Sequence, residues 1–199
     1  MKRWPDGTGR QRAFALAGAG VAFSLAFVLL WSAGLPDPAR LLAVDLSGEG
    51  EAPIAPVVGA RAPSFTVTSA EGDLLDLGEL RGAPVVLNFW ATWCAPCEAE
   101  LPGLQAVYEE SRAEGLRILA VNAGEPVEVF APWAAARGLT FDLVPDVEGR
   151  LAVLYQIRGL PQTVVIGPDG VIGDIFYGAI TAGDLEVALQ SLHTSDPQN

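Results

Sequence analysis

The stretch "NFWATWCAPCEAELP", residues 88–102, contains both cysteines of the chain, Cys94 and Cys97, with only Ala95 and Pro96 between them. Aromatic side chains precede the pair and carboxylates follow it. Two cysteines at this spacing can form a structural disulfide, half of a metal site, or a redox couple that opens and closes. The rest of the sequence distinguishes these three interpretations.

A structural disulfide is a weak interpretation. The chain has 199 residues and 50% of them are hydrophobic, so it can bury a core without cross-links. A disulfide between residues three apart closes a very short loop and restricts the unfolded chain little. We therefore expect one domain with a hydrophobic core plus additional segments.

A metal site is also weakly supported. A structural zinc ion takes four ligands and the cysteine pair supplies two. The single histidine, His193, lies near the C-terminal end, and Glu98 stands where c-type haem attachment needs a histidine. Zinc shared between two chains remains an alternative. For the single chain we predict no metal and no other cofactor.

The N-terminal part predicts a membrane anchor over residues 13–35. No residue from Ala13 to Pro36 is charged, and the segment is long enough to cross a bilayer as a helix. Four basic residues precede it, which predicts a cytoplasmic N-terminus over residues 1–12 and an extracytoplasmic remainder. The predicted location is thus the cell membrane, with a single span. A cleaved signal peptide, cut near Ser32, is the alternative.

Residues 36–58 are rich in proline, glycine and small side chains, and we interpret them as a linker. The predicted folded domain covers residues 59–195, and residues 196–199 form a tail. Twenty-three acidic and eight basic residues follow Pro36. This excess of negative charge argues against nucleic acid and anionic lipid as partners.

From Gly59 onward, strand and helix patterns alternate. "PVVLNFWA", residues 84–91, is a near-continuous apolar run, which is typical of a central strand covered on both faces. Two short strands are expected before it, around a turn at Glu71 and Gly72. After it we expect a helix from about Cys94 to Ala113, bent at Pro102, and a second buried strand over residues 116–123.

The second half continues the alternation and ends with a hairpin and a helix. The expected elements are a helical segment at 125–138, a strand at 141–144, a helical turn at 150–155, a hairpin at 162–178, and a last helix to about His193. Thr181 and Asp184 form a capping box at its start. The order predicts an α/β fold in which helices flank a central mixed β-sheet.

The order of strands and helices, with Cys-x-x-Cys at a strand-to-helix turn, resembles that of thioredoxin. It resembles more closely the membrane-anchored TlpA/ResA group of thiol–disulfide oxidoreductases in the AhpC/TSA–Redoxin superfamily. The resemblance covers about residues 59–193. It depends on "FWATWCAPC", on "GLPQT", in which Pro161 matches the family's cis-proline, and on the helical insertion at 125–138. It implies a thioredoxin-like fold with an N-terminal hairpin.

The chemistry of the pair follows from its place on a helix. A thiolate is the nucleophile in disulfide exchange, and a helix N-terminus lowers the pKa of a thiol. Cys94 at this terminus should therefore attack, and Cys97, one turn further along, should resolve the mixed disulfide. The neutral residues Ala95 and Pro96 between them favour a reducing couple.

A proton carrier is expected near Cys97. Thioredoxin has a buried aspartate six residues before its first cysteine, and here that residue is Asn88. The resemblance assigns the role to Glu100, three residues after Cys97, where partial burial would raise its pKa. The alternative is a surface carboxylate, which is what we expect of Glu98.

The resemblance also implies a substrate-binding rim. If the Leu160–Pro161 bond is cis, the proline ring packs against the disulfide, and the backbone of Leu160 pairs with an extended substrate. Trp93 would give an apolar flank. Phe89 and Trp90 are expected in the core, and the sequence does not decide the place of Trp133.

The sequence thus predicts an extracytoplasmic, membrane-tethered thiol–disulfide oxidoreductase of reducing character, acting as a monomer. The resemblance implies that it reduces exported proteins, with the Cys-x-x-Cys-His site of apocytochrome c the leading candidate, and takes electrons from a membrane thiol–disulfide donor. A peroxiredoxin-type thiol peroxidase is the alternative, although Ala91 replaces its usual threonine or serine. A binding module that merely retains the fold is a third possibility.

Overall fold

The apolar run after Pro84 forms strand β3 (Val85–Trp90), in which all six residues are buried. It lies in the middle of a five-stranded sheet of order β5-β4-β3-β6-β7. The computed structural model describes residues 52–194, so the predicted anchor and most of the linker lie outside the described residues. Within the described range no helix is long and apolar enough to span a membrane.

The sheet is mixed, as predicted. β4 (Arg117–Ala123) runs parallel to β3, and β5 (Asp142–Asp146) runs parallel to β4. β6 (Gln162–Ile166) is antiparallel to β3, and β7 (Ile172–Tyr177) is antiparallel to β6. The three parallel strands therefore end at the same edge of the sheet, where the cysteine pair follows β3.

Alternate side chains of β3 enter two separate cores, because successive residues of a strand point to opposite faces. Val86 and Trp90 pack with one cluster, and Val85, Leu87 and Phe89 pack with the other. This alternation places Asn88 on the same face as Trp90. The polar side chain of Asn88 therefore points into the first core.

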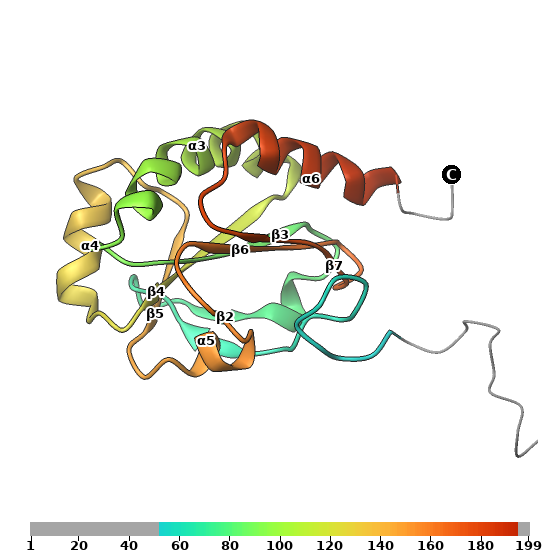
Figure 1. Ribbon diagram of the computed structural model, residues 1–199, viewed down its shortest axis with the longest axis horizontal. Helices are drawn as coiled ribbons and strands as arrows, with labels where there is room; N and C mark the ends of the chain where they lie inside the picture. Colours follow the sequence, from blue (N-terminus) through green and yellow to red (C-terminus); the bar gives the residue numbers. More distant parts are fainter. Residues whose placement is uncertain (1–51, 195–199) are drawn as a thin grey trace, which may run out of the picture. The chain divides into compact units, whose positions relative to one another are not determined.

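Two long helices, α3 (Ala95–Ser111) and α6 (Ala182–Thr194), lie side by side on that face of the sheet (Figure 1). They approach closely at Gly103, where an added Cβ would lie 3.3 Å from the backbone nitrogen of Ala182. α4 (Val127–Ala135) adds Phe130 and Ala134 to the same core. This face carries the helix that begins at the cysteine pair.

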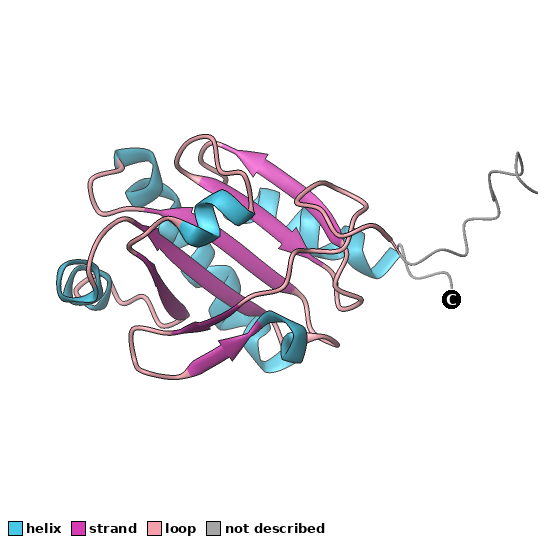
Figure 2. Cartoon of the chain, turned by 90° about the horizontal axis from the view of Figure 1, so that it is seen from below, coloured by secondary structure: helices cyan, strands magenta, loops and turns pink. Residues whose placement is uncertain are grey.

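The other face is covered by α5 (Arg150–Leu154) and by the N-terminal hairpin (Figure 2). The hairpin pairs β1 (Thr66–Thr68) with β2 (Leu74–Asp76), and the short 3₁₀ helix η1 (Leu77–Leu80) follows it. Tyr155 anchors this layer, because its hydroxyl donates to the carbonyl of Pro63 at 2.7 Å.

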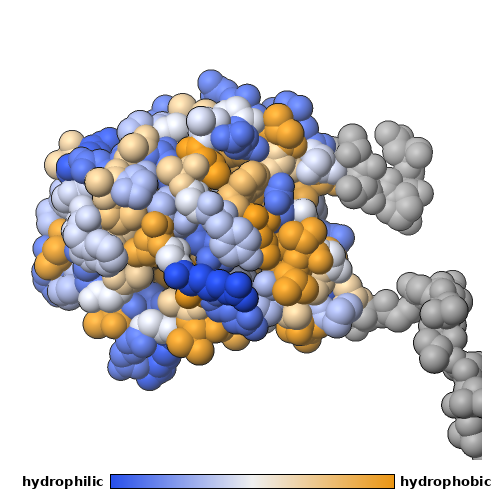
Figure 3. Space-filling view, viewed as in Figure 1, coloured by the Kyte–Doolittle hydropathy of each residue, from blue (hydrophilic) through white to orange (hydrophobic). Residues whose placement is uncertain are grey.

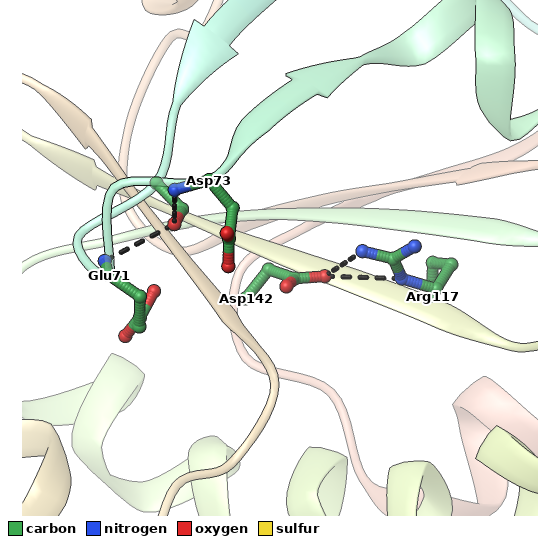
Figure 4. Close-up of polar contacts among 5 residues, drawn as sticks. Glu71, Asp73, Arg117 and Asp142 are labelled. Carbon is green, nitrogen blue, oxygen red and sulfur yellow. Dashed lines mark hydrogen bonds and ion pairs between the residues drawn. The ribbon is translucent and has the colours of Figure 1, made fainter.

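The hairpin turn docks against the edge strand β5 (Figure 4). The hydroxyl of Ser69 accepts the backbone N–H groups of Glu71 and Asp73, each at 3.2 Å. Ala70 donates its N–H to the carbonyl of Leu143 at 2.8 Å. An ion pair of 2.6 Å between Arg117 and Asp142 then joins β4 to β5. The hairpin thus covers part of the sheet edge.

Several boundaries differ from the sequence-based expectation. β5 starts one residue later and continues through Pro145, which an edge strand tolerates. The last turn of α3 gives way to the 3₁₀ helix η2 (Arg112–Glu114), and α4 is shorter than the expected 125–138. Ala55 donates to the carbonyl of Arg61 at 3.1 Å, so the end of the predicted linker pairs with the domain.

Exposed apolar side chains are scattered over several elements of the described part. Hydrophilic and hydrophobic side chains are interspersed on the face shown in Figure 3. The large apolar side chains that are more than half exposed include Ile54, Val58, Trp93, Val153 and Tyr177. Trp93 is the one that adjoins the cysteine pair.

Candidate active site

The cysteine pair lies where β3 turns into α3. The turn is closed by a hydrogen bond of 3.2 Å from the N–H of Cys94 to the carbonyl of Ala91. Cys94 is the N-cap of α3, and its sulfur accepts the N–H of Cys97 at 3.3 Å. This is the placement that the sequence predicts for a thiol activated by a helix N-terminus.

The two cysteines form a disulfide with an S–S distance of 1.99 Å. Cys97 is fully buried and Cys94 is 5% exposed, so Cys94 is the more accessible residue of the pair although only slightly exposed. Trp93 is 70% exposed and flanks Cys94 as expected. Phe89 and Trp90 are fully buried, which confirms their predicted place in the core.

Glu100 lies on α3 three residues after Cys97 and is 4% exposed. Asn88 donates its Nδ2 to Oε1 of Glu100 at 2.7 Å, and Ile180 donates its backbone N–H to Oε2 at 3.0 Å. Burial raises the pKa of Glu100 above its usual range, although these two hydrogen bonds act in the opposite direction. Glu100 is thus a buried carboxylate rather than a surface one.

Asn88 fills the position of thioredoxin's buried aspartate. Its Nδ2 also donates to the hydroxyl of Thr163 at 3.0 Å. Its Oδ1, by contrast, is one of two buried side-chain polar atoms in residues 52–194 without a hydrogen-bond partner. Rotation of a side-chain amide by 180° exchanges its nitrogen and oxygen, so that it presents an acceptor in place of a donor. Asn88 can therefore pair with Glu100 in either protonation state.

The helical insertion packs against the first turn of α3 through a stack of side chains. The rings of Trp90 and Trp133 lie 5.2 Å apart, and the guanidinium carbon of Arg137 lies 3.5 Å from the Trp133 ring centroid. Arg137 also forms an ion pair of 2.6 Å with Glu98. Glu98 is at the surface as expected, and Trp133 is partly buried in the core.

The peptide bond between Leu160 and Pro161 is cis, as predicted. It directly precedes β6, where Gln162 lies opposite Phe89 of β3. The carbonyl of Pro161 accepts the N–H of Gly178 at 2.9 Å. Residues 160 and 161 therefore lie at the same end of the sheet as the disulfide. Pairing of Leu160 with a substrate stays a prediction.

Several residues of this region were missed by sequence reasoning. Thr163, Ile180 and Arg137 all contact the site across long stretches of sequence, and Glu125 contacts the turn before Cys94. No pattern in the sequence marks these contacts. Within residues 52–194, no three histidine, cysteine or acidic side chains group as a metal site would require.

Comparison with known proteins identifies similar sequences and structures. The profile of the AhpC/TSA family matches residues 58–175. The thiol-disulfide oxidoreductase ResA of Geobacillus kaustophilus is 39% identical over 135 residues, which are 68% of this chain and 78% of that protein. ResA of Bacillus subtilis is 33% identical over 123 residues, 62% of this chain and 69% of that protein.

Solved structures agree with the fold. The crystal structure of StoA from Bacillus subtilis has a TM-score of 0.57 and 28% identity, covering 63% of this chain and 96% of that chain. A secreted Mycobacterium tuberculosis disulfide oxidoreductase homologous to E. coli DsbE has a TM-score of 0.58 and 25% identity, covering 64% of this chain and 95% of that chain. Both similarities support the predicted thioredoxin-like fold.

Proposed function

Because this chain belongs to the AhpC/TSA family and is a thiol–disulfide oxidoreductase with ResA-type relatives, we propose that it reduces disulfides of exported proteins outside the cytoplasmic membrane. The observation that carries the proposal is the disulfide at the N-terminus of α3, in which Cys94 accepts the N–H of Cys97. A thiolate at Cys94 would be stabilised by the same N–H and by the helix N-terminus.

The reaction starts from the dithiol form of the pair. The Cys94 thiolate attacks one sulfur of the substrate disulfide, and the other substrate sulfur leaves as a thiolate that takes up a proton. Cys97 then loses its proton and attacks the Cys94 sulfur of the mixed disulfide. This second step releases the reduced substrate and leaves the Cys94–Cys97 disulfide. Two electrons have then passed from the protein to the substrate.

Glu100 is the proposed acceptor of the Cys97 proton. It lies one turn further along the same helix, and its raised pKa brings it closer to neutral pH, where a proton carrier works best. Asn88 can hold it before and after the transfer. Trp93 and the backbone of Leu160 would contact the substrate chain next to the disulfide.

The proposed location and partners come from the sequence. Residues 13–35 would anchor a monomer in the cell membrane, with the domain on the outer side. A membrane thiol–disulfide donor would return the pair to the dithiol form. The proposed substrate is the Cys-x-x-Cys-His site of apocytochrome c, which has to be reduced before haem is attached.

Trapping in cells tests this proposal. A Cys97→Ser variant cannot resolve the mixed disulfide, so it should accumulate covalently bound substrate on Cys94. We expect the captured proteins to be exported ones that contain Cys-x-x-Cys-His, and none with the Cys94→Ser, Cys97→Ser double variant. Capture of cytoplasmic proteins alone would contradict the location, and capture of exported proteins lacking this motif would contradict the substrate.

A further inference from the structure

The turn that leads into Cys94 is held by a carboxylate from another part of the chain. Oε2 of Glu125 accepts the backbone N–H of Thr92 at 2.8 Å, and Oε1 accepts the Thr92 hydroxyl. Both donors of Thr92 therefore end on one side chain, 33 positions later in the sequence. Only Trp93 separates Thr92 from Cys94.

Glu125 is itself fixed to the sheet. Asn122 donates its Nδ2 to Oε2 of Glu125 at 2.8 Å, and its Oδ1 accepts the backbone N–H of Glu125 at 3.3 Å. Asn122 is fully buried on β4 and lies opposite Trp90, the last residue of β3. Glu125 thus connects the active-site turn to a rigid part of the fold.

We call the carboxylate of Glu125, with its hydrogen bonds to Thr92 and Asn122, the clamp. This clamp also carries a negative charge. Burial raises the pKa of Glu125, but the hydrogen bonds from Thr92 and Asn122 outweigh burial and leave its pKa below the usual range. The charged groups on the first turns of α3 include Glu98, which is paired with Arg137, and the buried Glu100. A negative charge close to a thiol disfavours the thiolate.

We propose that Glu125 is a positioning residue for disulfide exchange. Through Thr92 it holds the turn of residues 91–93, and with it Trp93 and Cys94, in the position that meets a protein disulfide. Trp93 is mostly exposed, so the turn has to fix its position. This inference rests on the proposed reductase function and assigns to that site a residue outside the Cys94–Glu100 motif.

The test compares two ways of breaking the clamp. Glu125→Gln removes the charge at nearly constant shape, and Thr92→Val removes the hydroxyl donor but keeps the charge. Thr92→Ser keeps both donors, and Glu128→Gln changes an exposed glutamate three residues away. For each variant we would measure kcat and KM with insulin, the reaction rate with a small aromatic disulfide, and the pKa of Cys94 from the pH dependence of its alkylation.

Glu125→Gln and Thr92→Val should each raise KM for insulin several-fold. The small disulfide needs no contact with Trp93, so it should react with these variants no more slowly than with the parent protein. Glu125→Gln alone should also lower the Cys94 pKa, by about half a unit, because it removes a negative charge from the turn that precedes Cys94. Thr92→Ser and Glu128→Gln should behave like the parent.

A purely structural contact would give a different pattern. Equal slowing with both disulfides, or a lower melting temperature with parental KM and Cys94 pKa, would overturn the proposal. If the parent itself reduces neither disulfide, it is the reductase function that fails. The Cys94 pKa of Glu125→Gln can then still be measured, because alkylation does not depend on reductase activity, and a parental value would overturn the influence of Glu125 on Cys94.

Discussion

Asn88 stands where thioredoxin has its buried aspartate, and we propose that Glu100 takes over the role of that acid. The amide on β3 does not titrate, and the carboxylate on α3 is buried against it at a distance of 2.7 Å. Moving the acid from the strand to the helix places it on the same element as Cys97, three residues further on. The two residues depend on each other, because burial of Glu100 is tolerated only with hydrogen-bond donors nearby.

Replacing Glu100 by glutamine is therefore the residue-scale test of the proton carrier. The negative charge of Glu100 disfavours a thiolate close by, so Glu100→Gln should lower the thiol pKa values by as much as a unit, about 1.4 kcal/mol. Turnover should nevertheless fall, because Cys97 loses its proton acceptor. Glu110→Gln, an exposed change on the same helix, is the control. If both variants have the thiol pKa values and the turnover of the parent protein, Glu100 is not the proton carrier.

The raised pKa of Glu100 also predicts a change in stability with pH. The folded protein holds this proton more tightly than the unfolded chain, so its free energy of unfolding falls as the pH rises from the ordinary value of 4.5 through the raised pKa. Glu100→Gln lacks this ionisation, and its stability should fall less over that window. Denaturant unfolding at several pH values measures the difference, and parallel curves would contradict it.

The difference in exposure between the two cysteines predicts their order of reaction. Cys94 caps α3 and keeps a little exposure, whereas Cys97 is fully buried. Alkylation of the reduced protein near neutral pH, followed by mass spectrometry of its peptides, should therefore label Cys94 first. Labelling of Cys97 first would reverse the assigned roles of attacking and resolving cysteine.

At the scale of elements, local signals were sufficient where structure is determined locally. The apolar run of β3, the turn of the N-terminal hairpin and the capping box of α6 could all be predicted, because each depends on neighbouring residues. The contacts of Glu125 with Thr92 and of Arg137 with Glu98 could not. They join residues 33 and 39 positions apart, and only the folded sheet brings them together.

The capping box of α6 makes an element-scale prediction. The hydroxyl of Thr181 accepts the N–H of Asp184 at 3.2 Å, and Asp184 accepts the N–H of Thr181 at 2.9 Å. Thr181→Ala should lower the free energy of unfolding by about 1 kcal/mol, and Thr181→Ser should restore most of it. Chemical denaturation measures both variants. An alanine variant as stable as the parent would show that the cap contributes nothing.

At the scale of the whole molecule, the proposed function requires the domain to be tethered outside the membrane. If residues 13–35 are a retained anchor, the full-length protein should stay with membranes after a high-pH carbonate wash. Protease added from outside should then digest the C-terminal domain. Recovery of a soluble chain that begins near Leu35 would establish a cleaved signal peptide in place of an anchor.

The central claim is that the dithiol of Cys94 and Cys97 exchanges electrons with disulfides. The most direct measurement is the rate at which the reduced domain is oxidised by a Cys-x-x-Cys-His peptide disulfide and, separately, by hydrogen peroxide, followed by quenched alkylation. We predict that the peptide reacts faster, and that Cys97→Ser stalls as a covalent adduct of the peptide on Cys94. Faster oxidation by peroxide, with the dithiol left intact by the peptide, would contradict this account and favour a thiol peroxidase.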